Sequence, residues 1–274
     1  VISNEFSHQL ALIKQLRQAF LREAMQGKLV PQNPEDEPAS ELLKKIKAEK
    51  EKLIAEKKLK KEKELPPIKP EEIPFSIPES LVWCRLGEIC DDIIDCPHST
   101  PHYLEIDTGF YGIDTNCINE KGEIIRLRPL SQESYKERTK RLIPKSLDIV
   151  YAREGSIGLA AFIPNDKTLC LGQRVMLFRA SKAILPEYLK YFVTEESYKN
   201  RLLAKNRGMG AKHVNVKDII LSLTALPPLP EQQRIVAKLE QLMQFCDGLE
   251  AAIKESKARN EELLGQVLRE AMGG

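Results

Sequence analysis

The sequence predicts an α+β fold: one globular domain with a twisted, mixed sheet, flanked by long coiled-coil helices. Residues 230–271 repeat apolar side chains in alternating steps of four and three, which is typical of a helical face that packs along another helix. Residues 81–226 instead hold short apolar and β-branched runs separated by glycine and proline, as strands and turns do. The string Leu-Arg-Glu-Ala-Met occurs at 21–25 and again at 268–272, so one helical element is used on both sides of the domain.

Composition limits the kind of protein this can be. With 274 residues and 42% hydrophobic residues, the chain can bury one good core with peripheral helices rather than two full domains. It has no run near the roughly 18 apolar residues of a membrane span and no signal pattern at its start, so we expect a cytoplasmic protein without a membrane partner. The six cysteines form no C-x-x-C pair, which favours reduced thiols. A net charge of +2 neither favours nor excludes nucleic acid.

The N-terminal part is predicted to hold a short helix, a charged strap and a linker. Residues 5–26 are rich in helix formers and end at Gly27 and Pro31, which stop a helix. The tract 41–64 carries ten lysines against six glutamates; a solvated helix acting as a strap is the simpler interpretation, and a basic arm along phosphate is the alternative. Five prolines within 66–78 favour an extended connector.

Local patterns predict the elements of the globular part. The apolar, β-branched runs 148–151, 159–163 and 175–178 are predicted strands, and 131–141 and 186–205 are predicted helices. We therefore divide the chain into a short helix, a strap with its linker, a globular domain and a long spacer helix, with the bounds 1–30, 31–74, 75–226 and 227–274.

The last helix begins after Pro227 and Pro228, with Pro230 in its first turn. Roughly 40 helical residues make a rod of about 60 Å, and a rod of that length needs a partner helix to cover its apolar stripe. Ser256 and Asn260 interrupt the stripe; they either enforce register or mark a place where the stripe wanders. The residues predicted to form the coiled-coil interface are Ile235, Leu239, Leu242, Leu249, Ile253, Leu263 and Val267.

Basic residues gather in two parts of the domain. Residues 86–120 carry eight carboxylates and no lysine or arginine, and this segment alone would repel a phosphate backbone. The stretch 121–145 holds eight basic residues against three acidic ones, and 197–217 holds six basic residues and no carboxylate. These two basic clusters can form one binding face for an anionic partner.

Two loops carry side chains with recognition chemistry. The glycine-hinged loop 205–215 holds arginine and asparagine, which can bind guanine and adenine in bidentate fashion; an ordinary basic surface loop is the alternative. The loop 96–102 holds a cysteine and two histidines but lacks the four ligands of a closed zinc site, so we expect no metal there. Its polar side chains either face bases or cap a turn.

No catalytic motif is found in the sequence. There is no Walker phosphate loop, no H-E-x-x-H, no G-x-S-x-G, and no Asn-Pro-Pro-Tyr or Asp-Pro-Pro-Tyr string. We therefore assign no catalytic residue, and a zinc-dependent nuclease or hydrolase is the least favoured class.

Several segments together carry a family resemblance. The segments 226–236, 148–158 and 95–101 resemble the DNA specificity subunit of type I restriction-modification systems, and so do 26–32 and 36–40. The resemblance implies that a complete subunit has two target-recognition domains, each reading one half of a bipartite DNA site. It further implies that a helical region follows each domain and that the two helices pair antiparallel as a spacer.

The resemblance also implies a division of labour among subunits. Modification subunits supply S-adenosylmethionine and adenine methylation, and the restriction subunit supplies ATP-driven translocation and cleavage. This chain is accordingly expected to bind no cofactor itself, because S-adenosylmethionine, ATP and Mg²⁺ belong to the partner subunits. Its expected partners are double-stranded DNA, the modification and restriction subunits, and a second recognition half. The alternative is a non-enzymatic coiled-coil scaffold whose globular domain binds protein rather than DNA.

The length of this chain differs from that of a complete subunit of the family. The chain holds one recognition domain, at 75–226, and begins at Val1 without a methionine, which indicates a fragment or a non-standard start codon. It is either half of a longer subunit or a half-length version that dimerises. A symmetric pair would read a palindromic bipartite site, whereas a longer chain would read two unlike halves.

The resulting hypothesis for DNA binding assigns individual residues. The clusters 121–145 and 197–217 straddle the duplex, while the loops 98–103 and 206–215 enter the major groove. Phosphate contacts are assigned to Arg138, Lys140, Arg141, Lys205, Arg207 and Lys212. Base readout is assigned to His98, Ser99, Thr100, His102, Tyr103, His213 and Asn215. Gln173 and Arg174 are interpreted as framework within a strand-like run.

Overall fold

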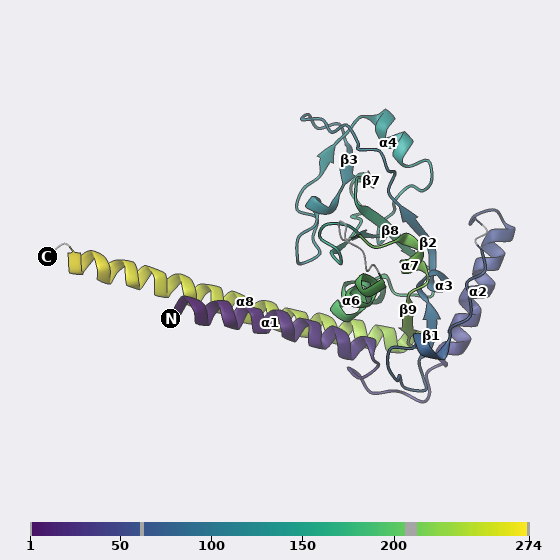
Figure 1. The fold of residues 1–274 in the computed structure, drawn as a ribbon, viewed down its shortest axis with the longest axis horizontal. Helices are drawn as coiled ribbons and strands as arrows, with labels where there is room; N and C mark the ends of the chain where they lie inside the picture. The colour runs from purple at the N-terminus through teal and green to yellow at the C-terminus, as the bar shows by residue number, and fades with distance from the viewer. Residues whose placement is uncertain (1, 61–62, 206–212, 273–274) are drawn as a thin grey trace.

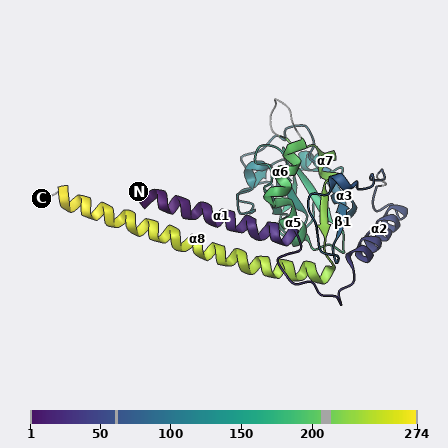
Figure 2. The ribbon, with the colours of Figure 1, turned by 60° about the horizontal axis from the view of Figure 1, so that its bottom comes forward.

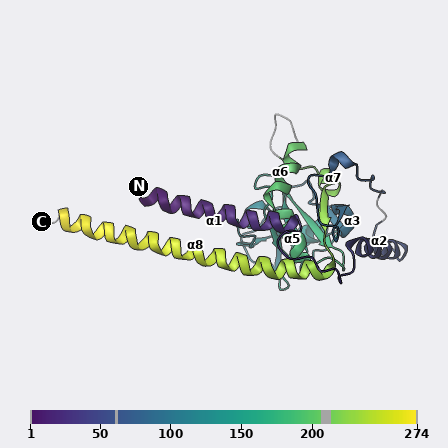
Figure 3. The same ribbon diagram turned by 90° about the horizontal axis from the view of Figure 1, so that it is seen from below.

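The computed structural model describes residues 2–60, 63–205 and 213–272, and in this part of the chain a globular body sits on a long pair of helices (Figure 1). Helix α1 (Ile2–Met25) runs antiparallel to α8 (Leu229–Met272), and the two lie side by side in Figures 1, 2 and 3. The far ends of both helices therefore point away from the body, and α8 extends beyond the start of α1 (Figure 2). The predicted long C-terminal helix is confirmed.

Apolar side chains and ion pairs join the two helices. Leu21 of α1 and Ile235 of α8 are buried in the same core, at the end nearest the globular body. Further along, Arg17 of α1 pairs with Asp247 at 2.6 Å and with Glu250 at 2.8 Å. The first half of α8 thus has a partner helix within this chain, as the stripe of apolar residues requires.

Nine strands form three small sheets in the described residues. The largest is antiparallel in the order β2-β8-β5-β6, with the strands Cys90–Asp95, Val175–Ala180, Ile149–Ala152 and Ala160–Phe162. The second has the order β4-β3-β7 and pairs β3 with β7 in parallel, with the strands Arg128–Pro129, Phe110–Ile113 and Thr168–Leu171. The third pairs β1 (Val82–Arg85) with β9 (Leu223–Leu226). The α+β class with mixed pairing is confirmed, and the single predicted sheet is divided into three.

The centre of the four-stranded sheet is buried on both faces. In β5, Ile149 and Tyr151 belong to one apolar core and Val150 belongs to another. In β8, Met176 and Leu177 divide between the two cores in the same way. Because successive side chains of a strand point to opposite faces, a sheet between two cores needs unbroken apolar runs. This is why the predicted strands are continuous apolar runs rather than alternating ones.

Five shorter helices lie in the globular body, within the residues that the structure describes. They are α3, α4, α5, α6 and α7, at Leu86–Ile89, Gln132–Arg138, Pro186–Thr194, Glu196–Lys205 and Val216–Ile220, with short 3-10 turns at Pro70–Glu72 and Thr115–Cys117. Helices α4, α5 and α6 fall within the predicted ranges 131–141 and 186–205, and α3 and α7 were not predicted. The predicted helix 186–205 is broken at Glu195, whose buried carboxylate accepts hydrogen bonds from the backbone N–H groups of Ser197 and Tyr198, both at 2.8 Å. None of the helices in the described ranges is long and apolar enough to cross a membrane.

Helix α2 (Ala39–Ala55) packs on the globular body at the side away from the two chain ends (Figures 1 and 3). Its Leu42 and Ile46 are buried. The Nζ of Lys50 donates to the carbonyls of Gly87 at 2.8 Å and Cys90 at 2.6 Å. Helix α2 thus packs against the body over part of the predicted strap and ends before the lysine-rich tract does, and the strap role stays a prediction.

Candidate nucleic-acid interface

Three loops leave the four-stranded sheet at the same end. The loop 96–103 follows β2, the loop 153–159 follows β5, and the turn 172–174 precedes β8. Strand β8 lies between β2 and β5 and is antiparallel to both, so its start lies beside the ends of the other two. We name this surface the loop edge and define it by residues 96–103, 153–159, 172–174 and 213–215.

Side-chain and backbone contacts join the segments of the loop edge. The Nε2 of Gln173 donates to Thr100 Oγ1 at 2.6 Å. Beside it, Arg174 Nε lies 3.4 Å from Glu154 Oε1, and Glu154 forms a backbone bridge with His213. The two loops predicted to read bases are therefore parts of one surface, as far as the structure describes them.

Most of the predicted base readers occupy exposed positions on the loop edge. These are His98, Ser99, Thr100, His102, His213 and Asn215. Asn215 directly precedes α7, and its Nδ2 donates to Asp218 Oδ2 at 3.3 Å. Imidazole, hydroxyl and amide groups both donate and accept hydrogen bonds, which is what reading base edges requires.

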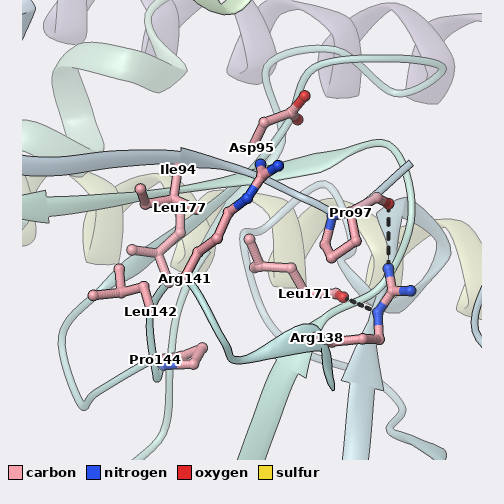
Figure 4. A pocket seen from close by; sticks show the side chains of 9 residues that line it. All are labelled: Ile94, Asp95, Pro97, Arg138, Arg141, Leu142, Pro144, Leu171 and Leu177. Atoms are coloured by element: carbon pink, nitrogen blue, oxygen red, sulfur yellow. Dashed lines mark hydrogen bonds between the residues drawn. The ribbon is translucent and has the colours of Figure 1, made fainter. Parts of the chain in front are cut away.

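Arg138 is not a surface charge. It is 7% exposed at the end of α4, and its guanidinium donates to the carbonyls of Leu171 at 2.7 Å and Pro97 at 3.4 Å (Figure 4). Further bonds reach the carbonyls of Ser99 at 2.9 Å and Gly172 at 2.5 Å. The assignment of Arg138 as a phosphate contact is therefore wrong, because its donors are used inside the domain.

Tyr103 is the last residue of the loop 96–103 and makes its contacts with the framework of the domain. The Cζ of Arg128 lies 3.5 Å from the centroid of the Tyr103 ring, and Arg128 Nη1 pairs with buried Asp114 at 2.5 Å. The Tyr103 hydroxyl also donates to Asp114, at 3.4 Å, and burial raises the pKa of this hydroxyl. The assignment of Tyr103 to base readout is therefore wrong, and Arg128 likewise serves an internal role rather than the basic face.

The other predicted phosphate contacts that the structure describes are exposed, unlike Arg138. Lys140 and Arg141 are exposed just after α4, and Lys205 is exposed at the end of α6. Arg141 lines a shallow pocket together with the end of β2 (Figure 4). Arg207 and Lys212 lie outside the described residues.

The predicted coiled-coil interface is covered along part of its length. Ile235 and Leu239 are buried, and Leu242 and Ile253 are partly buried. Leu249, Leu263 and Val267 are exposed, the last two by 58% and 60%. The role of these three residues as an interface stays a prediction.

Sequence reasoning missed Gln173 and Arg174, which it interpreted as framework within a strand. They form the turn between β7 and β8 instead, and Arg174 has a φ of +62° with a side chain that is 59% exposed. Gly172 was the available signal, since a glycine inside an apolar run marks a turn or a close approach of two chains. Both residues now count as candidates for contact with a ligand on the loop edge.

The loop 96–103 is poorly arranged to bind a metal. Cys96 is buried, whereas His98 and His102 are exposed. Burial raises the pKa of the Cys96 thiol and so disfavours the thiolate that would bind a metal. Across the ranges that the structure describes, no three His, Cys, Asp or Glu side chains gather as metal ligands would.

Fold and site together define a class of protein: a binding domain with a polar, partly basic edge, carried at one end of an antiparallel helical pair. The family model described as the type I restriction modification DNA specificity domain matches residues 104–256. The chain belongs to this family.

Two curated relatives from Escherichia coli are similar to most of the chain. The type I restriction enzyme EcoAI specificity subunit is 34% identical over 256 residues, which cover 90% of this chain and 42% of the relative. The EcoEI specificity subunit is 27% identical over 271 residues, which cover 90% of this chain and 43% of the relative. The chain thus spans less than half the length of these relatives.

Two solved structures share the fold. The HsdS subunit from Thermoanaerobacter tengcongensis matches with a TM-score of 0.50 at 20% identity, covering 100% of this chain and 57% of that chain. A structure that concerns complex assembly and conformational transition of the type I R-M system matches with a TM-score of 0.55 at 20% identity, covering 98% of this chain and 57% of that chain. Both support the α+β assignment.

Proposed function

We propose that this chain is the DNA-recognition part of a type I restriction-modification complex and that it reads one half of a bipartite site. The loop edge carries this proposal. Thr100 and His213 are far apart in the sequence, yet the turn 172–174 and Glu154 connect them into one exposed polar surface. A surface of this kind, beside exposed lysine and arginine, suits a nucleic acid.

In this proposal the loop edge reads bases in the major groove. Each well-formed bidentate contact to a base edge contributes about 1–3 kcal/mol of discrimination. The residues assigned to readout are His98, Ser99, Thr100, His102, His213 and Asn215, with Gln173 and Arg174 added from the structure.

Basic side chains beside the edge hold the duplex irrespective of its sequence. Lys140, Arg141 and Lys205 are exposed and close in the sequence to elements that border the loop edge. Contacts of this type fix the register of the protein on DNA and make binding dependent on salt. Arg207 and Lys212 keep their assignment to the same role.

We infer that the chain itself performs no chemistry. The relatives it matches are named as specificity subunits. Methylation and cleavage, with S-adenosylmethionine, ATP and Mg²⁺, then belong to the modification and restriction subunits that this chain positions. The proposed role requires access to cellular DNA, so we place the protein in the cytoplasm.

The repeated string supports a second recognition half. In the first copy, Leu21 and Met25 are buried, at 5% and 4% exposure; their equivalents in the second copy, Leu268 and Met272, are 51% and 86% exposed. An identical sequence that is covered in α1 and uncovered in α8 indicates a missing neighbour. We propose that a second recognition unit covers the end of α8, supplied by a longer chain or by a second copy of this one.

Selection from a randomised duplex library tests the proposed function. The full chain is incubated with the library at moderate salt, alone and together with the methyltransferase subunit of its own system, and the retained duplexes are sequenced. Enrichment of a short defined motif is the expected result. A chain that retains no DNA under either condition would instead behave as the protein-binding scaffold, and the proposal would fail.

Single substitutions then separate readers from phosphate contacts. Asn215→Ala is expected to relax the selected motif at one position by about 1–3 kcal/mol, while Lys140→Ala is expected to weaken binding to all sequences and to lower the salt slope. Gln244→Ala, at an exposed position of α8, is the control and changes neither property.

A further inference from the structure

We propose that Arg138 is a positioning residue for base readout: it touches no base, and it fixes the spacing between the loop 96–103 and the turn 172–174. This inference rests on the proposed function. It assigns a role in that function to a residue that is buried beneath the exposed side chains of the loop edge.

The guanidinium of Arg138 binds both segments at once. On the side of the turn, Nε donates to the carbonyl of Leu171 at 2.7 Å and Nη2 donates to that of Gly172 at 2.5 Å. On the side of the loop, Nη1 donates to the carbonyl of Ser99 at 2.9 Å, and Nη2 lies 3.4 Å from that of Pro97. Figure 4 shows the bonds to Leu171 and Pro97 diverging from one side chain.

Arginine is the side chain whose geometry suits this task. Its guanidinium is planar and presents five N–H donors in a fixed fork, whereas a lysine ammonium presents three donors from a single nitrogen. A lysine has no fork with which to make all of these bonds at once. Among the residues that the structure describes, no carboxylate forms an ion pair with Arg138; its partners are four backbone carbonyls and, at 3.4 Å, the Ser99 hydroxyl oxygen. Its role is therefore to hold two stretches of backbone at a set distance.

Strand β3 and Tyr103 also restrict the turn 172–174. The Gly172 N–H donates to the carbonyl of Ile113 at 2.6 Å. A Cβ placed on Gly172 would lie 2.6 Å from that same oxygen and 2.6 Å from the Tyr103 hydroxyl oxygen. Strand β3 and Tyr103 thus fix the turn on one side, and Arg138 fixes it on the other.

The backbone that Arg138 holds carries the proposed readers. Ser99 and Thr100 follow Pro97 in the loop, and Gln173 follows Gly172 in the turn and donates to Thr100 at 2.6 Å. Hydrogen bonds to base edges tolerate shifts of only a few tenths of an ångström. A change in the spacing of these segments should therefore lower discrimination between sequences while it leaves contacts to phosphate in place.

The test compares Arg138→Lys and Arg138→Gln in the full chain. The readout is the ratio of the affinity for the motif selected by the unaltered chain to the affinity for a scrambled duplex. We expect this ratio to fall roughly tenfold or more in both variants, with an unchanged slope of log affinity against log salt. Lys136→Gln, which removes a charge at an exposed position of the same helix, is the matched control and keeps the ratio.

Two results of this comparison would overturn the proposal. If Arg138→Lys keeps the affinity ratio and Arg138→Gln lowers it, the positive charge at position 138 is what matters, and the forked shape of the guanidinium is not needed. If both variants weaken binding to the two duplexes equally, Arg138 merely supports the fold.

Amide hydrogen exchange in the absence of DNA provides an independent test. Arg138→Lys is expected to speed exchange at 98–100 and 171–174 and to leave α1 and α8 unchanged. Unchanged exchange in the loop and the turn contradicts the positioning role, whatever the DNA experiments show. If exchange changes as expected but the unaltered chain selects no motif, the proposed function fails, and the readout role fails with it.

Discussion

At the residue scale, arginine side chains cross-link the segments that border the loop edge. Arg153 binds Asp95 through two hydrogen bonds, at 2.7 and 3.0 Å, and its own N–H donates to the carbonyl of Arg174 at 3.1 Å. At the opposite end of strands β5 and β8, Arg179 binds Asp148 at 2.6 Å. Because a guanidinium can hold two oxygens in one plane, each of these residues fixes the direction of a chain as well as its distance. The loop edge is therefore supported from within the domain.

Gly172 supplies the first prediction. A side chain at this position meets the carbonyl of Ile113 and the hydroxyl of Tyr103, each 2.6 Å from the new Cβ, so Gly172→Ala should force the turn away from β3. Overpacking of this kind costs about 1–3 kcal/mol, which urea unfolding of the purified chain will measure. Gly248→Ala is the control: nothing lies within 4 Å of a Cβ there, and in the interior of α8 the change should stabilise by roughly 0.5–1 kcal/mol. A Gly172→Ala protein as stable as the parent would contradict the close approach seen here.

Residue roles were the hardest feature to predict from the sequence. The imidazole and hydroxyl groups at 98–100 are exposed in a proline-bounded loop, and their assignment to base readout stays a prediction. Arg138 and Tyr103 were misassigned, because burial depends on distant segments: the carbonyls that Arg138 binds lie 33 to 41 residues away in the chain. No local pattern contains that information.

At the scale of elements, the pairing of α1 with α8 predicts a weak sensitivity to acid. Hydrogen bonds from Lys254 and Arg17 lower the pKa of Glu250 to about 2, from an ordinary value of 4.5. A carboxyl with a lowered pKa in the folded state stabilises that state above its unfolded pKa, and the contribution is lost as the pH falls through the folded value. The stabilisation is therefore present above pH 4.5 and disappears toward pH 2.

We expect Glu250→Gln to flatten the pH dependence of the melting temperature across this window. The effect should be small, because the pair lies on the surface of the arm, where water and salt screen it. Thermal unfolding followed by circular dichroism at a series of pH values measures it. Glu240→Gln removes one charge from an exposed position on the same helix and serves as the control. If the melting temperatures of the parent and of Glu250→Gln change in parallel with pH, the ion pairs of Glu250 with Arg17 and Lys254 do not contribute to stability.

The two copies of the repeated string allow a matched comparison. Leu21 is buried in the core, so Leu21→Ala should destabilise the isolated chain by about 2–5 kcal/mol. Leu268 is 51% exposed, so Leu268→Ala should change stability by less than about 0.5 kcal/mol. Chemical unfolding at low protein concentration measures both. Equal losses in the two variants would mean that the end of α8 is already covered within one chain.

Elements were largely predictable where one pattern dominates. The four-three spacing gave the long helix within one or two residues of its bounds, and the apolar runs gave three strands of the central sheet. The division into three sheets was not predictable, because pairing such as that of β3 with β7 depends on register between distant segments. The break between α5 and α6 was also missed, since it depends on a single buried carboxylate, Glu195.

At the scale of the whole molecule, the exposed end of α8 is where the second recognition unit is proposed to bind. If a second copy covers this end, light scattering should find a particle of twice 31.1 kDa at high concentration. Leu268→Asp should then return the chain to a monomer, because it places a charge in an apolar contact. Leu12→Asp, at a residue of α1 that is 47% exposed, is the control. A parent chain that stays monomeric at all concentrations would exclude the second copy and leave the longer chain as the source of the second unit.

The overall plan of the molecule was visible in the sequence, since a repeated helical string on either side of a strand-rich middle already implies a body with helical arms. The two apolar cores were not visible. Cys96, Ile113 and Leu169 build the second core from three different strands or loops, and their proximity follows only from the folded topology.

The burial of the central sheet on both faces has a consequence for how such proteins change over time. Because β5 and the first four residues of β8 are buried, almost any replacement there disturbs an apolar interior. The loop edge, which lies beyond the ends of these strands, is free of that restriction. Under the proposed function, new target preferences can accordingly arise by exchange of a few residues of the loop edge while the buried strands stay the same. What such a protein recognises can then diversify without loss of the fold.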